Sequence, residues 1–138
     1  MCIFSPKEVD NNIVAFKVFF KVGNKYCPIM SPDETLYELN IKYKARYVLQ
    51  DRASMKYLPS FHAFSKLEHA ILFLQQEGKT RERLNPRFAK HKLVICKVKL
   101  SGRCYKEVDI ARYDKNDTCR FTVSGTIMKI IREVYVFD

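Results

Sequence analysis

The chain has 138 residues, 47% of them hydrophobic, which suits a single domain spanning residues 1–138 with a sizeable core. Its 25 Lys and Arg residues outnumber 15 Asp and Glu residues, and the resulting net charge of +10 favours polyanions or acidic surfaces as partners. The longest apolar runs fall far short of the about 20 residues that a membrane-spanning helix needs, so we expect no contact with a membrane.

The first predicted element is a strand at residues 13–22, where apolar residues at even positions alternate with lysines. A Gly-Asn pair then predicts a tight two-residue turn. Folding residues 25–29 back across this turn places Cys27 opposite Phe20, so that the apolar residues stay on one face. Pro28 indicates that the returning strand lies at a sheet edge or ends there.

A second amphipathic strand is predicted at residues 41–49, where aromatic and aliphatic residues alternate with basic ones. After a further aromatic segment the apolar residues follow the helical period, which predicts one main helix at residues 66–77. Ser65 and Glu68 have the spacing of a capping box at the start of this helix, and Gly78 supplies a stop signal at its end.

The densest charge follows this helix, where eight basic residues between positions 79 and 99 stand against one acidic residue, Glu82. Arg binds phosphate through two hydrogen bonds and Lys binds it as a point charge, so we predict a basic edge that contacts a polyanion. The alternatives are a solvated connector and a surface for an acidic protein. Only Phe88 interrupts the run, which argues against base stacking on single strands. The candidate polyanion-binding residues are Lys79, Arg81, Arg83, Arg87, Lys90, Lys92, Lys97 and Lys99.

The remaining segments predict strands. Residues 93–100 alternate, the Ser-Gly pair at 101–102 predicts a turn into a strand at 104–108, and residues 126–137 are rich in β-branched residues. We therefore predict an α+β fold, a curved and mostly antiparallel sheet of about five or six strands with the helix on one face. The apolar positions of these strands and the apolar face of the helix predict one core, in which the following residues are buried together: Val14, Phe16, Val18, Phe20, Leu67, Ile71, Leu74, Val94, Cys96 and Val98.

The cysteines and histidines indicate neither a metal nor a cofactor. The cysteines are odd in number and widely spaced, without a Cys-x-x-Cys pair, which is typical of free thiols in a reducing compartment. Residues 1–7 contain no continuous apolar segment of the secretory type, so we expect a cytoplasmic protein. Neither the cysteines nor the histidines have the spacing of metal ligands. The cysteines are Cys2, Cys27, Cys96, Cys104 and Cys119.

Two residues allow an enzymatic interpretation. His62 precedes the predicted helix start, where exposed amides attract anions, so its imidazole is a candidate ligand or acid–base group. Glu133 lies in the last predicted strand, and a carboxylate on a strand can be an active-site residue. Each has an ordinary alternative, a structural histidine and a carboxylate paired with a lysine across the sheet. The chain has four glycines and no phosphate-binding glycine-rich motif, which argues against Rossmann and P-loop nucleotide sites.

Residues 59–70, together with the preceding Gly-Asn hairpin and residues 94–102, resemble a set of small uncharacterised bacterial and phage-type proteins. Their shared core reads Gly-Phe-His-x-Phe-x-x-Leu-Glu-x-Ala, and here Ser60 replaces the glycine and His69 stands where an acid is usual. The resemblance covers the order of elements over residues 13–135. A looser local similarity to ADP-ribosyltransferase-like folds implies a site beside a nicotinamide.

The sequence therefore suggests a small, basic, non-enzymatic binding protein of phage or mobile-element origin. Its expected partner is a polyanion, either nucleic acid or a nucleotide, or an acidic host protein. The alternative is a small ADP-ribosyltransferase-like enzyme, or a protein with a nucleotide pocket, that uses His62 and Glu133. The oligomeric state stays open.

Overall fold

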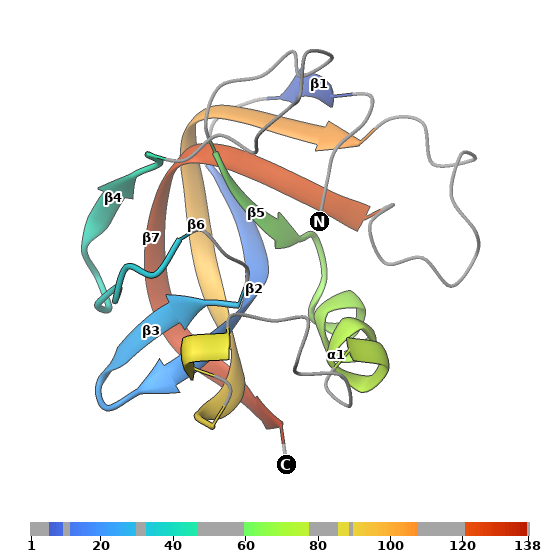
Figure 1. The fold of residues 1–138 in the computed structure, drawn as a ribbon. Helices are drawn as coiled ribbons and strands as arrows, with labels where there is room; N and C mark the ends of the chain where they lie inside the picture. The colour runs from blue at the N-terminus through green and yellow to red at the C-terminus, as the bar shows by residue number, and fades with distance from the viewer. Residues whose placement is uncertain are drawn as a thin grey trace.

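The computed structural model describes residues 6–9, 12–29, 33–46, 60–77, 86–88, 90–107 and 121–137. Within these ranges lie seven strands, one α-helix and a short 3-10 helix (Figure 1). In chain order they are β1 (Pro6–Val9), β2 (Ile13–Val22), β3 (Lys25–Pro28), β4 (Lys42–Lys44), β5 (Phe61–Phe64), α1 (Leu67–Glu77), η2 (Pro86–Phe88), β6 (Lys92–Glu107) and β7 (Thr122–Phe137).

The strands form one sheet that closes on itself. Their order is β1-β6-β2-β5-β7-β4, with β3 added to β2. The long strands β6 and β7 also pair with each other, so antiparallel ladders link β2 to β6, β6 to β7, β7 to β5, and β5 back to β2. Helix α1 packs against β2, β5 and β6 (Figure 1). The predicted α+β class is confirmed, with seven strands in the described ranges.

Closure gives the sheet two buried sides, each with its own apolar cluster. Strand β2 contributes to both, because its odd positions point to the inner side and its even positions to the outer side. The inner core contains Ala15, Phe19, Val94, Cys96, Val98, Leu100, Met128 and Ile130. The outer core, which includes the buried residues of α1, contains Val18, Phe20, Phe64, Ala70, Leu74, Leu93 and Ile95.

The predicted single core is therefore wrong. It combined the even positions of β2 with the even positions of β6, but the register pairs Val18 with Ile95 and Phe19 with Val94. Paired residues share a face, so the even positions of these two strands lie on opposite sides of the sheet. Val14 is 47% exposed and belongs to neither core.

The predicted hairpin and helix are confirmed. Phe20 lies opposite Cys27, and β3 ends at Pro28 as its missing N–H requires. Helix α1 begins at Leu67, one residue later than predicted. The backbone N–H of Ala70 donates to the carbonyl of Lys66, so Lys66 lies just before the helix. Ser65 donates its backbone N–H to the carbonyl of Phe121 at 3.1 Å. The predicted stop at residue 78 lies outside the described residues.

Three expectations about strands change. The turn predicted at residues 101–102 is wrong, because β6 continues through it while its register with β7 shifts between Ser101 and Cys104. Gly102 lies in this shift with a φ of 74°, as in a bulge that bends a strand. Of the strand predicted at residues 41–49, only residues 42–44 form β4; residues 41, 45 and 46 lie outside it, and residues 47–49 are not described. Strand β7 begins at residue 122, four residues before the predicted start at 126.

Candidate polyanion-binding face

Three lysines lie directly opposite one another on neighbouring strands. Lys42 on β4 pairs with Lys129 on β7, and Lys129 also pairs with Lys99 on β6. Further along the same two long strands, Lys97 pairs with Arg132. Paired residues point to the same face with Cβ atoms about 4.5–5.5 Å apart, so these cations form one patch. Lys44 joins it by the alternation of β4, and we call the six residues the basic face: Lys42, Lys44, Lys97, Lys99, Lys129 and Arg132.

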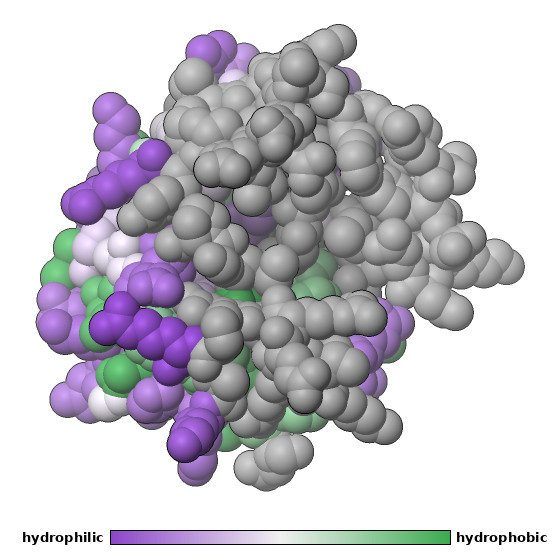
Figure 2. Space-filling view, in the orientation of Figure 1, coloured by the Kyte–Doolittle hydropathy of each residue, from purple (hydrophilic) through white to green (hydrophobic). Residues whose placement is uncertain are grey.

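The alternation of the strands directs these side chains away from the inner core. On β6 the inward residues Cys96, Val98 and Leu100 are fully buried, which turns the two lysines between them outward. On β7 Met128 and Ile130 are fully buried in the same way. The basic face therefore lies on the outer, convex side of the closed sheet. Along the edge of the molecule where β4 lies, hydrophilic side chains reach the surface together with less polar ones (Figure 2).

The charge of the basic face is not neutralised within the described part of the chain. No ion pair there joins any of the six cations to a carboxylate. Their cross-strand neighbours include Val14, Phe16 and Ile127, which carry no charge. Four of the six are exposed and two, Lys97 and Lys129, are half-buried. The patch thus presents positive charge to solvent.

The structure divides the basic residues that the sequence grouped together. Lys97 and Lys99 belong to the basic face. Lys92 has the parity of the inward residues of β6 and pairs with Lys21, so it lies on the other side of the sheet. Lys90 is exposed in the turn before β6. Lys79, Arg81 and Arg83 lie outside the described residues, and the binding role of the whole predicted set stays a prediction.

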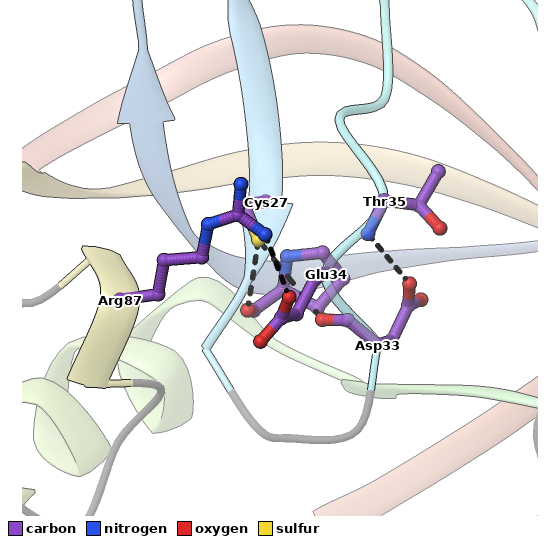
Figure 3. Close-up of polar contacts among 6 residues, drawn as sticks. Cys27, Asp33, Glu34, Thr35 and Arg87 are labelled. Carbon is purple, nitrogen blue, oxygen red and sulfur yellow. Dashed lines mark hydrogen bonds and ion pairs between the residues drawn. The ribbon is translucent and has the colours of Figure 1, made fainter.

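Arg87 has a local structural partner. Its guanidinium donates from Nη1 to Oε2 of Glu34 at 3.0 Å, which joins η2 to the segment after β3 (Figure 3). Both side chains are largely exposed, so this ion pair contributes at most about 1 kcal/mol. Beside it, burial raises the pKa of the Cys27 thiol to about 12, with Asp33 and Glu34 adding to the effect. This thiol stays protonated and has no nucleophilic role at neutral pH.

Sequence reasoning missed four members of the basic face: Lys42, Lys44, Lys129 and Arg132. The alternation at residues 41–49 and 126–137 indicated that lysines line the polar side of both segments. Alternation along one strand does not reveal which strand lies beside it. Only the pairings of β4 with β7 and of β7 with β6 bring these residues next to Lys97 and Lys99.

His62 and Glu133 are not brought together. His62 alternates with the inner-core residues Phe61 and Ala63, so its side chain lies on the outer side. Glu133 pairs with the inner-core residue Cys96, and its Oε2 accepts a hydrogen bond from Lys21 Nζ at 3.1 Å. Glu133 thus has a lysine partner, as its ordinary interpretation expected, but this lysine lies on β2 and not opposite Glu133 on a neighbouring strand.

The environment of His62 favours a neutral ring. Burial, followed by the charge of Lys17, lowers the pKa of this imidazole from 6.5 to about 3. The neutral ring is therefore the dominant form at physiological pH, and it is a weak base. A general base works best with a pKa near the working pH, so this environment does not favour acid–base catalysis.

Lys17 lies at the seam between β2 and β5. These strands share a single residue pair, Phe16 with Phe64. Next to it, the ammonium of Lys17 donates a hydrogen bond to the backbone carbonyl of His62 at 2.6 Å. The residue is 8% exposed, and burial lowers the pKa of its amine from 10.5 to about 8, while Asp33 opposes that shift. Lys17 thus adds a side-chain hydrogen bond where the backbone ladder is shortest.

No group of histidine, cysteine and carboxylate side chains able to hold a metal occurs among the described residues. None of the described helices is long and apolar enough to cross a membrane. No protein-family model matches the chain, and neither curated proteins nor solved structures include a significant match to it.

Proposed function

We propose that the chain is a non-enzymatic binding protein that contacts a polyanion through the basic face. The observation that supports this most is the direct pairing of Lys42, Lys129 and Lys99 across three neighbouring strands. Like charges directly opposite each other destabilise a sheet. A polyanion bound over them would relieve this repulsion, and it would release its condensed counterions as it binds.

The enzymatic alternative lacks a corresponding observation. His62 and Glu133 lie on opposite sides of the sheet, and Glu133 already bonds Lys21. An acidic protein surface is the remaining alternative partner, and it differs from a polyanion in offering discrete carboxylates instead of a continuous line of charge.

A charge-reversal experiment tests the proposal. The triple variant Lys97→Glu, Lys99→Glu, Lys129→Glu should elute from immobilised heparin at much lower salt than the wild type, because it inverts the charge at the centre of the patch. The matched control is Lys25→Glu, Lys66→Glu, Lys106→Glu, three exposed lysines outside the basic face. It has the same net charge and should elute close to the wild type.

Equal loss of heparin binding in both triple variants would show that only the net charge matters, and would contradict a role for the basic face. Failure of the wild type to bind heparin even at low salt would reject a polyanion and leave an acidic protein as the partner. Thermal unfolding of all three proteins establishes that each is folded when it is compared.

A further inference from the structure

The basic face extends in two directions. Neighbouring strands lie about 4.8 Å apart, so the row from Lys42 through Lys129 to Lys99 spans about 10 Å across the sheet. Along a strand, alternate residues such as Lys97 and Lys99 are about 7 Å apart. A single extended nucleic-acid strand offers one line of phosphates, whereas the backbones of a B-form duplex flank a minor groove only about 6 Å wide. The patch is therefore wide enough for phosphates of two strands.

The patch offers no aromatic surface for bases. Tyr43 lies between two lysines of β4, but its ring packs edge-to-face on Tyr37 with centroids 4.6 Å apart, and its hydroxyl accepts a hydrogen bond from the Glu38 backbone N–H at 3.0 Å. Phe16, opposite Lys97, packs against the outer core. Proteins that hold single strands without sequence preference stack bases on exposed rings. The described part of the basic face lacks such rings.

The side-chain types also point away from base reading. Five of the six cations are lysines, which act as point charges with flexible stems, and Arg132 is the one guanidinium among them. Specific contacts in a groove come mainly from Arg, Asn or Gln held in a fixed geometry against base edges. Contacts from lysines to phosphates position a protein on the helix without carrying sequence information.

Resting on the proposed function, we infer that the polyanion is a nucleic-acid duplex, bound through the phosphates of both its strands and without sequence preference. The convex outer side of the sheet lies against the backbone, with the row Lys42, Lys129 and Lys99 crossing it. Bases stay stacked in the duplex, because none of the described residues of this face offers a ring to replace their stacking partners.

Fluorescence anisotropy with three probes tests the inference: a short mixed-sequence DNA duplex, one of its strands alone, and a duplex of scrambled sequence. The two duplexes should bind equally, and each should bind about tenfold more tightly than the single strand at low salt, because the duplex has the higher charge density. The variant Lys99→Gln, Lys129→Gln should flatten the dependence of log K on log salt by about 1.8 on the duplex, about 0.9 for each lost phosphate contact.

The control variant Lys25→Gln, Lys106→Gln changes the same charge outside the patch and should leave that slope as in the wild type. Equal or tighter binding of the single strand would overturn the inference, as would a preference between the two duplexes. Binding to heparin but to neither duplex would overturn the inference alone and leave the proposed function standing. Binding to neither heparin nor nucleic acid would overturn both.

Discussion

Lys17 lies in an environment that is unusual for a lysine. A lysine in an alternating strand usually points to solvent, yet this one lies among inner-core residues, with its ammonium 5.9 Å from the centre of the Phe19 ring. Its hydrogen bond to His62 offsets part of the cost of removing a charge from water. The lowered pKa shows that the compensation is incomplete, because burial outweighs the charge of Asp33.

This pKa predicts how stability depends on pH. The amine binds its proton less tightly in the folded chain, with a pKa of about 8 against 10.5 when unfolded. Between these values the unfolded state binds more protons, so stability rises with pH. From pH 8 to pH 9 the wild type should gain about 1 kcal/mol relative to Lys17→Met. Urea unfolding of both proteins at the two pH values measures the difference.

The comparison with Lys17→Met removes the effect of other titrating groups. Burial raises the pKa values of the Cys27 and Cys96 thiols, which lowers stability as pH rises above 9, but it does so in both proteins. Lys25→Met, an exposed lysine on β3, is the control and should show no pH-dependent difference from the wild type. An unchanged gap between wild type and Lys17→Met at the two pH values would refute the buried-amine assignment.

Among the elements, β6 shows most clearly how one residue changes the course of a strand. Gly102 interrupts the alternation at a positive φ, and the backbone N–H of Arg103 donates to Thr126 Oγ1 at 3.0 Å. The register of β6 with β7 also shifts at two earlier points, between Ile95 and Cys96 and between Lys97 and Val98, and the shift at Gly102 is the one that contains a left-handed residue. The bend lets β6 pair with β2 over its first half and with β1 over its last residues.

Replacement of Gly102 by Ala should destabilise the protein by about 2–4 kcal/mol, through left-handed backbone strain and a collision of the new Cβ with Thr126 Oγ1. Gly23 is the matched control, since its φ is also positive but nothing lies within 4 Å of the position of a Cβ. Gly23→Ala should cost about 1 kcal/mol. Equal losses in chemical denaturation would mean that the contact with Thr126 has no effect, and adding Thr126→Ala to Gly102→Ala should recover part of the loss.

At the scale of the whole molecule, the closed sheet creates two cores and leaves part of its outer side open. Helix α1 packs over the outer core, whereas the basic face lies elsewhere on the same side. The same strands β6 and β7 thus stabilise the fold through their inward residues and present charge through their outward ones. Alternate residues of β6 and β7 face opposite sides of the sheet, so the residues that bind and the residues that form the inner core are different ones. Charge variants of the basic face should therefore leave both cores intact.

Two valines of the same strand and the same parity test this arrangement. Val18 is 1% exposed in the outer core, and Val14 is 47% exposed beside Lys99. Val18→Ala should lower the free energy of unfolding by about 2 kcal/mol or more, through lost burial and a residual cavity. Val14→Ala should lower it by less than about 1 kcal/mol. Equal losses of unfolding free energy in the two variants would contradict the two-core arrangement. They would instead support the single core, containing both valines, that the alternation in the sequence predicts.

The sequence by itself determined the parts of this protein that depend on near neighbours. Period-2 alternation predicted β2, the Gly-Asn pair predicted the hairpin with Cys27 opposite Phe20, and the helical period predicted α1. These features follow from interactions between residues a few positions apart, so a linear pattern contains them. The same pattern showed lysines on the polar side of several segments, without showing how those segments lie together.

Only the tertiary structure decided the two cores and the basic face. The register of β2 against β6 placed Val94 opposite Phe19 and separated it from Val18, which no periodicity predicts. Ser101 and Gly102 carry the signals of a turn, and the long pairing of β6 with β7 makes them an irregularity within one strand. Lys42 and Lys129 become neighbours because β4 pairs with β7. Register between distant strands depends on the closure of the whole sheet, and a residue's own neighbours in the sequence do not contain that information.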